Sequence, residues 1–143
     1  MLNLPHAYAA LASTLHSNGY EVLPLDGKAP KVPKWSEVAI TQQQVAQWTA
    51  EKPKANIGLR CDQALMVDID IEVQAEAERM TQLILDQFPG GLIRRRGDSS
   101  KLALLYRRAD LDGVYKGQGQ KRYCHSGGGV VELFDNSGVQ MGI

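Results

Sequence analysis

The segment Leu65–Asp70, which reads Leu-Met-Val-Asp-Ile-Asp, constrains the fold of this chain more than any other feature. Side chains alternate between the two faces of a strand, so its apolar odd-numbered residues are expected on one face and Asp68 and Asp70 on the other. Two carboxylates placed this way lie roughly 6.5 Å apart, which suits hard cations. Like charges in a partly buried site repel each other, and a divalent metal would remove that cost. A strand end that emerges into solvent is the alternative interpretation.

A second strand is predicted at Val130–Phe134, where Glu132 stands among apolar residues. An acid in the middle of an apolar strand is seldom placed there for packing. If this strand neighbours the first, Glu132 converges with Asp68 and Asp70. Three carboxylates are a usual ligand set for a two-magnesium phosphoryl-transfer site. Glu132 as a charge that protects an edge strand against aggregation remains the alternative.

Between these strands lies the basic run Arg94-Arg95-Arg96-Gly97-Asp98-Ser99-Ser100-Lys101. Strand alternation sends Arg94 and Arg96 to one side and Arg95 to the other. Lys101 begins the next predicted strand, so hydroxyls, backbone N–H groups and cations surround a turn that suits the oxygens of a triphosphate. A solvated basic hairpin is equally compatible with this run, because turns favour Asp, Ser and Gly.

The rest of the chain predicts helices early and an antiparallel sheet late. Apolar spacing and capping signals indicate helices at about residues 5–18, from Thr41 onward, and at 73–87. Strands are expected at residues 20–25, 56–60, 64–70, 92–95, 101–107 and 129–134. The glycine-rich stretch 116–129 is expected to be a loop. The expected fold class is therefore α+β.

Length and composition exclude several classes of protein. The chain has 143 residues, which fits one domain over residues 1–143. Its composition, with 43% hydrophobic and 22% charged residues, excludes wholesale disorder. No apolar run reaches the roughly 20 residues that a bilayer requires, and no secretory leader opens the chain. We therefore expect a cytoplasmic protein with no membrane partner. Cys61 and Cys124 cannot build a disulfide framework, and neither zinc-ligand spacing nor a Walker-type loop is present.

The charges are unevenly distributed although the net charge is zero. Residues 62–88 hold seven acidic and one basic side chain, whereas residues 94–122 hold nine basic and three acidic ones. The zero balance argues against indiscriminate coating of nucleic acid. The separation of charge suits a cation at one pole and a polyphosphate at the other. The alternative interpretation is that these are ordinary solvated surface charges.

Taken in order, these features resemble the N-terminal bifunctional DNA primase/polymerase (prim-pol) domain of the archaeo-eukaryotic primase superfamily. The resemblance runs through Gly19–Leu25, Gly27–Pro30, Trp35, Thr41, Trp48, Asn56–Gly58, Asp68–Asp70, Gly97–Arg107 and Val131–Leu133. It implies a primase-like core with an RRM-like antiparallel sheet, joined to an N-terminal helical α/β part. Such domains occur in plasmid, phage and prophage replication proteins and are often fused to a helicase, so a replicative helicase is an expected partner.

The resemblance also implies the roles of individual residues. Asp68 and Asp70 match the family's first metal-binding motif and Glu132 matches the third-motif acid, so these three are the expected catalytic residues and ligands of Mg²⁺ or Mn²⁺. The second motif is commonly Ser-x-His, and this chain has Ser99-Ser100-Lys101 there, with lysine in place of the histidine that contacts phosphates. Nucleotide binding is expected of Lys101, Ser99, Ser100 and Arg96. Apart from the resemblance, contact with nucleic acid is expected of Lys28, Lys31, Lys34 and Arg94, and a plain solvated surface is the alternative interpretation of the lysine loop.

The predicted function is that of a DNA primase/polymerase, in which nucleoside triphosphates are joined along a single-stranded DNA template or a primer–template. The chain stops at Gly142-Ile143, shortly after the third motif, so the domain is expected to be truncated at its C-terminal end. Two alternatives remain open. A non-catalytic nucleotide- or single-stranded-DNA-binding module derived from a primase would bind without extending. A metal-dependent nuclease or phosphohydrolase with the same three acids would release mononucleotides.

Overall fold

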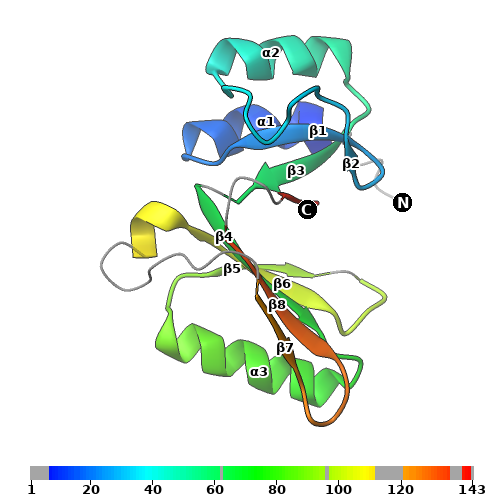
Figure 1. Ribbon diagram of the computed structural model, residues 1–143, viewed down its shortest axis with the longest axis vertical. Coiled ribbons are helices and arrows are strands. Elements are labelled where there is room, and N and C mark those ends of the chain that lie inside the picture. Colours follow the sequence, from blue (N-terminus) through cyan, green and yellow to red (C-terminus); the bar gives the residue numbers. More distant parts are fainter. Residues whose placement is uncertain (1–6, 62, 96, 112–120, 136–139, 143) are drawn as a thin grey trace. The chain divides into compact units, whose positions relative to one another are not determined.

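The computed structural model describes residues 7–61, 63–95, 97–111, 121–135 and 140–142. The chain divides into two compact units, Met1–Gln63 with Ser137–Ile143 and Ala64–Asn136 (Figure 1). Each unit contains its own antiparallel sheet, which confirms the expected α+β class. The expectation of a single domain over residues 1–143 stays a prediction. In the described ranges, no helix has the length and apolar character needed to span a bilayer.

The N-terminal unit combines two helices with a sheet of strand order β2-β1-β3-β9. Its elements are α1 (Ala7–Ser17), β1 (Val22–Asp26), β2 (Ala29–Pro30), α2 (Gln42–Glu51), β3 (Asn56–Arg60) and β9 (Gln140–Gly142). Helix α1 contacts α2, β1 and β3. Helix α2 begins where the sequence predicts, because the Thr41 hydroxyl oxygen accepts a hydrogen bond from the Gln44 N–H at 3.1 Å.

A buried arginine ties the N-terminal sheet to the loop that follows β2. Arg60, at the end of β3, is 5% exposed. Its guanidinium donates to the Glu21 carboxylate at 2.6 Å and to the carbonyls of Trp35 and Val38 at 3.0 and 2.8 Å. A buried cation is costly unless it is paired, so these contacts fix the loop against the sheet.

The C-terminal unit is a five-stranded sheet of order β5-β6-β4-β8-β7. Its elements are β4 (Ala64–Asp70), α3 (Gln74–Gln87), β5 (Leu92–Arg95), β6 (Leu102–Arg107), the 3₁₀ helix η1 (Arg108–Leu111), β7 (Lys121–Cys124) and β8 (Val130–Phe134). Strand β4 is central and pairs with β6 and β8. After the last strand, the buried carboxylate of Asp135 forms an ion pair with Arg108 of η1.

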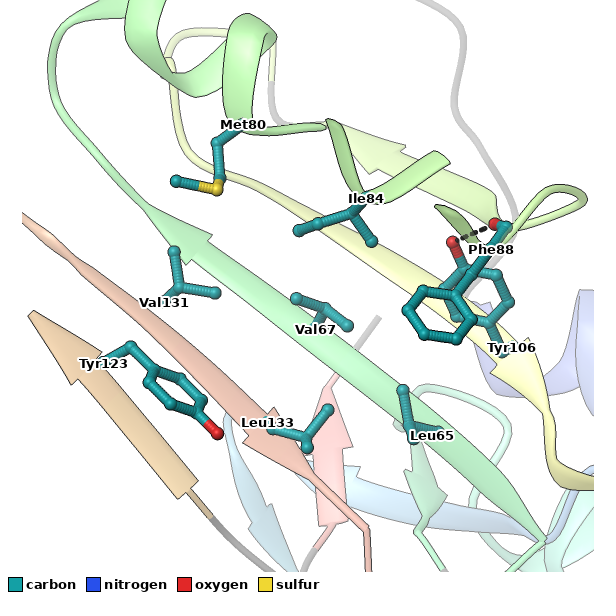
Figure 2. A pocket seen from close by; sticks show the side chains of 9 residues that line it. All are labelled: Leu65, Val67, Met80, Ile84, Phe88, Tyr106, Tyr123, Val131 and Leu133. Atoms are coloured by element: carbon teal, nitrogen blue, oxygen red, sulfur yellow. Dashed lines mark hydrogen bonds between the residues drawn. The ribbon is translucent and has the colours of Figure 1, made fainter. Parts of the chain in front are cut away.

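Helix α3 packs on one face of this sheet, and the core of the unit lies between the helix and the sheet. Val67 of β4, Val131 of β8 and Met80 of α3 line one apolar groove of about 310 Å³ (Figure 2). At the end of the groove, the Tyr106 hydroxyl donates a hydrogen bond to the Phe88 carbonyl at 2.7 Å. The odd-numbered residues of β4 therefore face α3. The even-numbered ones, including both aspartates, lie on the opposite face, as alternation predicts.

Three strands lie outside the predicted pattern. Strand β7 falls within the glycine-rich stretch 116–129, so the expectation of a loop is wrong for Lys121–Cys124. All four of its residues pair with β8. Strands β2 and β9 contain two and three residues, which is too few to produce a recognisable alternation.

Candidate functional site

Five residues form a single row across the five strands of the C-terminal unit. The backbone register pairs Arg94 of β5 with Ala103 of β6, Ala103 with Asp68 of β4, Asp68 with Glu132 of β8, and Glu132 with Arg122 of β7. Directly opposed residues of an antiparallel ladder project from the same face, so the whole row lies on the face opposite α3. We call this the carboxylate face. The row has arginines at its two ends and acids near its centre.

The three predicted carboxylates occupy neighbouring positions on the carboxylate face. The three carboxylates can converge only if β8 lies next to β4. The two strands are paired, and Asp68 is the register partner of Glu132. Asp70 lies two residues further along β4, opposite Val130. Opposed Cβ atoms are roughly 4.5–5.5 Å apart and alternate residues of a strand roughly 6.5 Å apart. The register therefore brings these three residues to one region of the sheet, while their catalytic role stays a prediction.

Each aspartate of β4 has a basic partner. Arg94 Nη2 lies 3.6 Å from Asp68 Oδ1, and these side chains are 22% and 26% exposed. Arg94 and Asp68 are two strands apart, and the residue between them is the fully buried Ala103. The Arg94 side chain therefore reaches Asp68 by passing over Ala103 of β6, whose side chain is small. Lys101 Nζ lies 2.9 Å from Asp70 Oδ1 in a more exposed pair.

The two serines of the basic turn are engaged in contacts within the chain. Ser100 Oγ lies 2.8 Å from the Ile71 carbonyl and 2.9 Å from the Glu72 carbonyl, and donates to them just beyond the end of β4. Ser99 Oγ accepts a hydrogen bond from the Lys101 N–H at 3.1 Å. These contacts shape the turn and hold the chain next to Asp70, whereas the predicted contact of both hydroxyls with a nucleotide stays a prediction.

The three consecutive arginines separate as alternation predicts. Arg94 faces the carboxylates, whereas Arg95 lies on the α3 side and forms an ion pair with Glu78 at 2.6 Å. The hydrogen bonds from Arg95 hold the pKa of Glu78 below its usual value. Arg96, which is predicted to bind nucleotide, lies outside the described residues.

A glycine turn between β7 and β8 borders the site next to Asp70. The turn residues Gly127–Gly129 line a pocket of about 360 Å³ together with Asp70, Glu72, Val73 and Val130. Gly129 has a φ of +101°, and a Cβ there would lie 2.5 Å from the Asp70 carbonyl oxygen. A side chain at this position would therefore push the turn away from the strand that carries the two aspartates.

His125 attaches this glycine turn to α3. Its Nδ1 accepts a hydrogen bond from the Gly127 N–H at 3.1 Å, and its Nε2 lies 3.3 Å from a Glu76 carboxylate oxygen. The pKa of Glu76 is lowered, first by hydrogen bonds from Arg79 and to a smaller extent by His125. One imidazole thus contacts both the turn and the helix, and it fixes the turn beside the pocket.

The donor chemistry of the carboxylate face fits Mg²⁺ or Mn²⁺. Both ions prefer carboxylate oxygens, and Asp68, Asp70 and Glu132 supply them from two paired strands. Among the described residues, however, no three Asp, Glu, His or Cys side chains are arranged so that they could hold a metal ion. Asp68 and Asp70 instead contact Arg94 and Lys101, which neutralise the same charge that a metal ion would neutralise.

The lysines predicted to contact nucleic acid belong to the N-terminal unit. Lys28 lies in the turn between β1 and β2, and Lys34 adopts a positive φ of 53° in the following loop. Lys31 is 3.9 Å from Asp26 and lines a pocket of about 420 Å³. Lys52 and Lys54, which were not predicted to contact nucleic acid, line the same pocket.

Arg122 and Glu72 also lie at the site without having been predicted there. Glu72 continues the alternation of Asp68 and Asp70, so the acidic series Asp-Ile-Asp-Ile-Glu was a signal for it in the sequence. Arg122 was not recognisable, because its strand was expected to be a loop.

The comparison with known proteins gives a direct family match. No curated protein matches the chain. The family model for the bifunctional DNA primase/polymerase N-terminal domain matches residues 12–133, a range that includes both predicted metal motifs and Lys101. Since this match covers most of the 143 residues, the chain belongs to the bifunctional DNA primase/polymerase (Prim-Pol) N-terminal family.

Proposed function

We propose that this chain catalyses template-directed nucleotidyl transfer on DNA, in the replication of a plasmid, phage or prophage. The observation that carries the proposal is the register of Asp68 with Glu132, with Asp70 beside them, in a chain of this family. The 3′-hydroxyl oxygen of a primer or an initiating nucleotide bonds to the α-phosphorus of the incoming triphosphate. The bond from that phosphorus to the bridging oxygen breaks, pyrophosphate leaves, and the hydroxyl proton passes to water.

Asp68, Asp70 and Glu132 are the residues that would hold Mg²⁺ or Mn²⁺. When bound, these ions neutralise phosphate charge and lower the pKa of a coordinated hydroxyl. Arg94 and Lys101 contact the aspartates at 3.6 and 2.9 Å, so they are already close to where the phosphates would lie. If these two side chains exchanged the aspartates for a nucleotide, they would donate charge-assisted hydrogen bonds to its phosphate oxygens.

Primer extension by the purified chain tests the proposal. We expect a labelled primer annealed to a longer template to be extended in Mg²⁺ or Mn²⁺, with the base added dictated by the template. Chelation with EDTA should stop the reaction. Shortening of the labelled strand to mononucleotides would instead identify a nuclease and contradict the proposal.

A non-catalytic nucleotide- or single-strand-binding module is the second candidate. It is favoured by the ion pairs of Asp68 and Asp70, which neutralise the carboxylates without a metal ion, and by lysine at position 101. This function predicts nucleotide binding by calorimetry with no extension product under any metal condition. Extension that requires metal excludes it.

Lys101→Ala is expected to raise the KM for the incoming nucleotide roughly tenfold, because a charge-assisted contact to a phosphate is lost. Lys101→Arg keeps the charge and should retain most of the affinity. Steady-state kinetics with varied nucleotide concentration measure the change. Arg107→Ala removes a cation from the other end of β6, where Arg107 contacts Asp110, and should leave the KM unchanged. Equal effects of both alanine variants would show that Lys101 contributes only general charge.

A further inference from the structure

Arg122 lies on the edge strand β7, on the same face of the sheet as the three carboxylates. It is the register partner of Glu132 and therefore projects from the carboxylate face. Its side chain is exposed, and within the described ranges no ion pair or side-chain hydrogen bond is found for it. Tyr123, the next residue, lies on the opposite face and lines the apolar groove beside Val131 and Leu133 (Figure 2).

The two arginines of the row are placed differently with respect to the acids. Arg94 reaches Asp68 across the small Ala103 and is 22% exposed. The residue between Arg122 and Asp68 is Glu132, a longer and negatively charged side chain. Two strand spacings separate the Cα atoms of Arg122 and Asp68, about 10 Å. Arg94 is thus bound to the centre of the site, whereas Arg122 is separated from it by an acid.

The acids at the centre of the row separate Arg122 from Arg94. On the proposed function, a triphosphate held by Lys101 and Arg94 would lie on the β5–β6 side of the carboxylates. Glu132 would repel the same phosphates if they extended toward β7. A phosphate bound by Arg122 at the β7 edge would therefore be a different one from the phosphates beside Lys101 and Arg94. A DNA backbone offers such a phosphate, because its phosphates repeat along the strand.

We propose that Arg122 binds a backbone phosphate of the DNA strand bound on the carboxylate face, at the β7 edge of the sheet. The inference rests on the proposed function in taking this face as the DNA-binding one. The planar guanidinium donates two parallel hydrogen bonds to phosphate oxygens, which gives arginine an advantage over lysine. The competing explanation is a charge that protects an edge strand from aggregation, with no ligand.

The matched control is Arg95. Arg95 and Arg122 lie on the two opposite edge strands of one sheet, both are exposed, and Arg95 is on the α3 face in an ion pair with Glu78. Removal of either arginine changes the net charge equally. The two arginines differ in the face they occupy, in the ion pair of Arg95 with Glu78 and in the proposed ligand.

The test measures binding of a fluorescent primer–template to the full chain by anisotropy, in EDTA, over a series of KCl concentrations. Arg122→Ala should weaken binding roughly tenfold and reduce the slope of log Kd against log salt by about one. Arg122→Lys should keep the slope and lose part of the affinity. Arg95→Ala should match the wild-type chain. Thermal melting of the Arg122 variants should be unchanged because the side chain is exposed, and Arg95→Ala should melt close to the wild type because the ion pair it removes is exposed.

Each contrary outcome has a distinct meaning. Wild-type affinity and slope in Arg122→Ala would overturn the inference and identify an edge-strand charge. A weaker nucleotide affinity of this variant in calorimetry, with DNA binding intact, would overturn it by placing Arg122 on the triphosphate. A wild-type chain that binds no DNA would also overturn it. A wild-type chain that binds DNA through Arg122 and yet fails to extend a primer would overturn the proposed function alone.

Discussion

Asp68→Asn is expected to reduce primer extension on the order of a thousandfold. Asp68 is the register partner of Glu132 and contacts Arg94, so it is central to the row of charges. Replacing its carboxylate with an amide removes a negative oxygen ligand from the proposed metal site. Metal ions supply several kcal/mol of transition-state stabilisation, and each 1.36 kcal/mol corresponds to a factor of ten.

The fold should tolerate this substitution. The pair with Arg94 is partly exposed and contributes roughly 0–1 kcal/mol, while the loss of one of several neighbouring acids relieves repulsion. Single-turnover extension measures the rate and urea unfolding measures stability. Asp86→Asn, an exposed acid on α3 that accepts a hydrogen bond from Gln82, is the control. Extension within tenfold of wild type, or unfolding of Asp68→Asn in metal-free buffer, would contradict the role given to Asp68.

Gly129→Ala should lower the free energy of unfolding by about 3 kcal/mol, within the range of strained or overpacked sites. At a φ of +101°, an L-residue is strained, at a cost of roughly 1–2 kcal/mol. The added Cβ would also meet the Asp70 carbonyl oxygen at 2.5 Å, and backbone cannot rotate away as a side chain can. The turn or the end of β4 must shift, so extension should fall as well.

Gly128→Ala separates these two causes. Gly128 has nearly the same φ, +94°, but a Cβ there would meet nothing within 4 Å. Chemical denaturation of both variants should therefore show the smaller, conformational loss alone for Gly128→Ala. Equal losses in the two variants would show that the contact with Asp70 is relieved without cost.

The face of β4 that Asp68 and Asp70 share was predictable from sequence because alternation along a strand is a local property. The residues at positions 68 and 70 must share a face once 64–70 is a strand, whatever surrounds it. The separation of Arg94 from Arg95 followed from the same rule. These predictions needed no knowledge of which strands pair.

The register that aligns Asp68 with Glu132 was not predictable in this way. Sixty-four positions separate the two residues in the chain, and no turn rule connects them. Strand β7 was missed because the glycines around it indicate a loop, whereas pairing with β8 stabilises Lys121–Cys124 as a strand. The contacts of Ser100 with two carbonyls also depend on the tertiary fold, since the partners lie 28 and 29 residues away.

The contacts of Asp68 with Arg94 and of Asp70 with Lys101 have a consequence for selectivity. A cation that binds an aspartate leaves the basic partner of that aspartate unpaired. An anion that binds a basic side chain likewise leaves its aspartate unpaired. A ligand that carries both signs replaces both partners at once, and no charge is left over. Such a site would disfavour the binding of an anion alone or of a cation alone, and would favour the binding of both together.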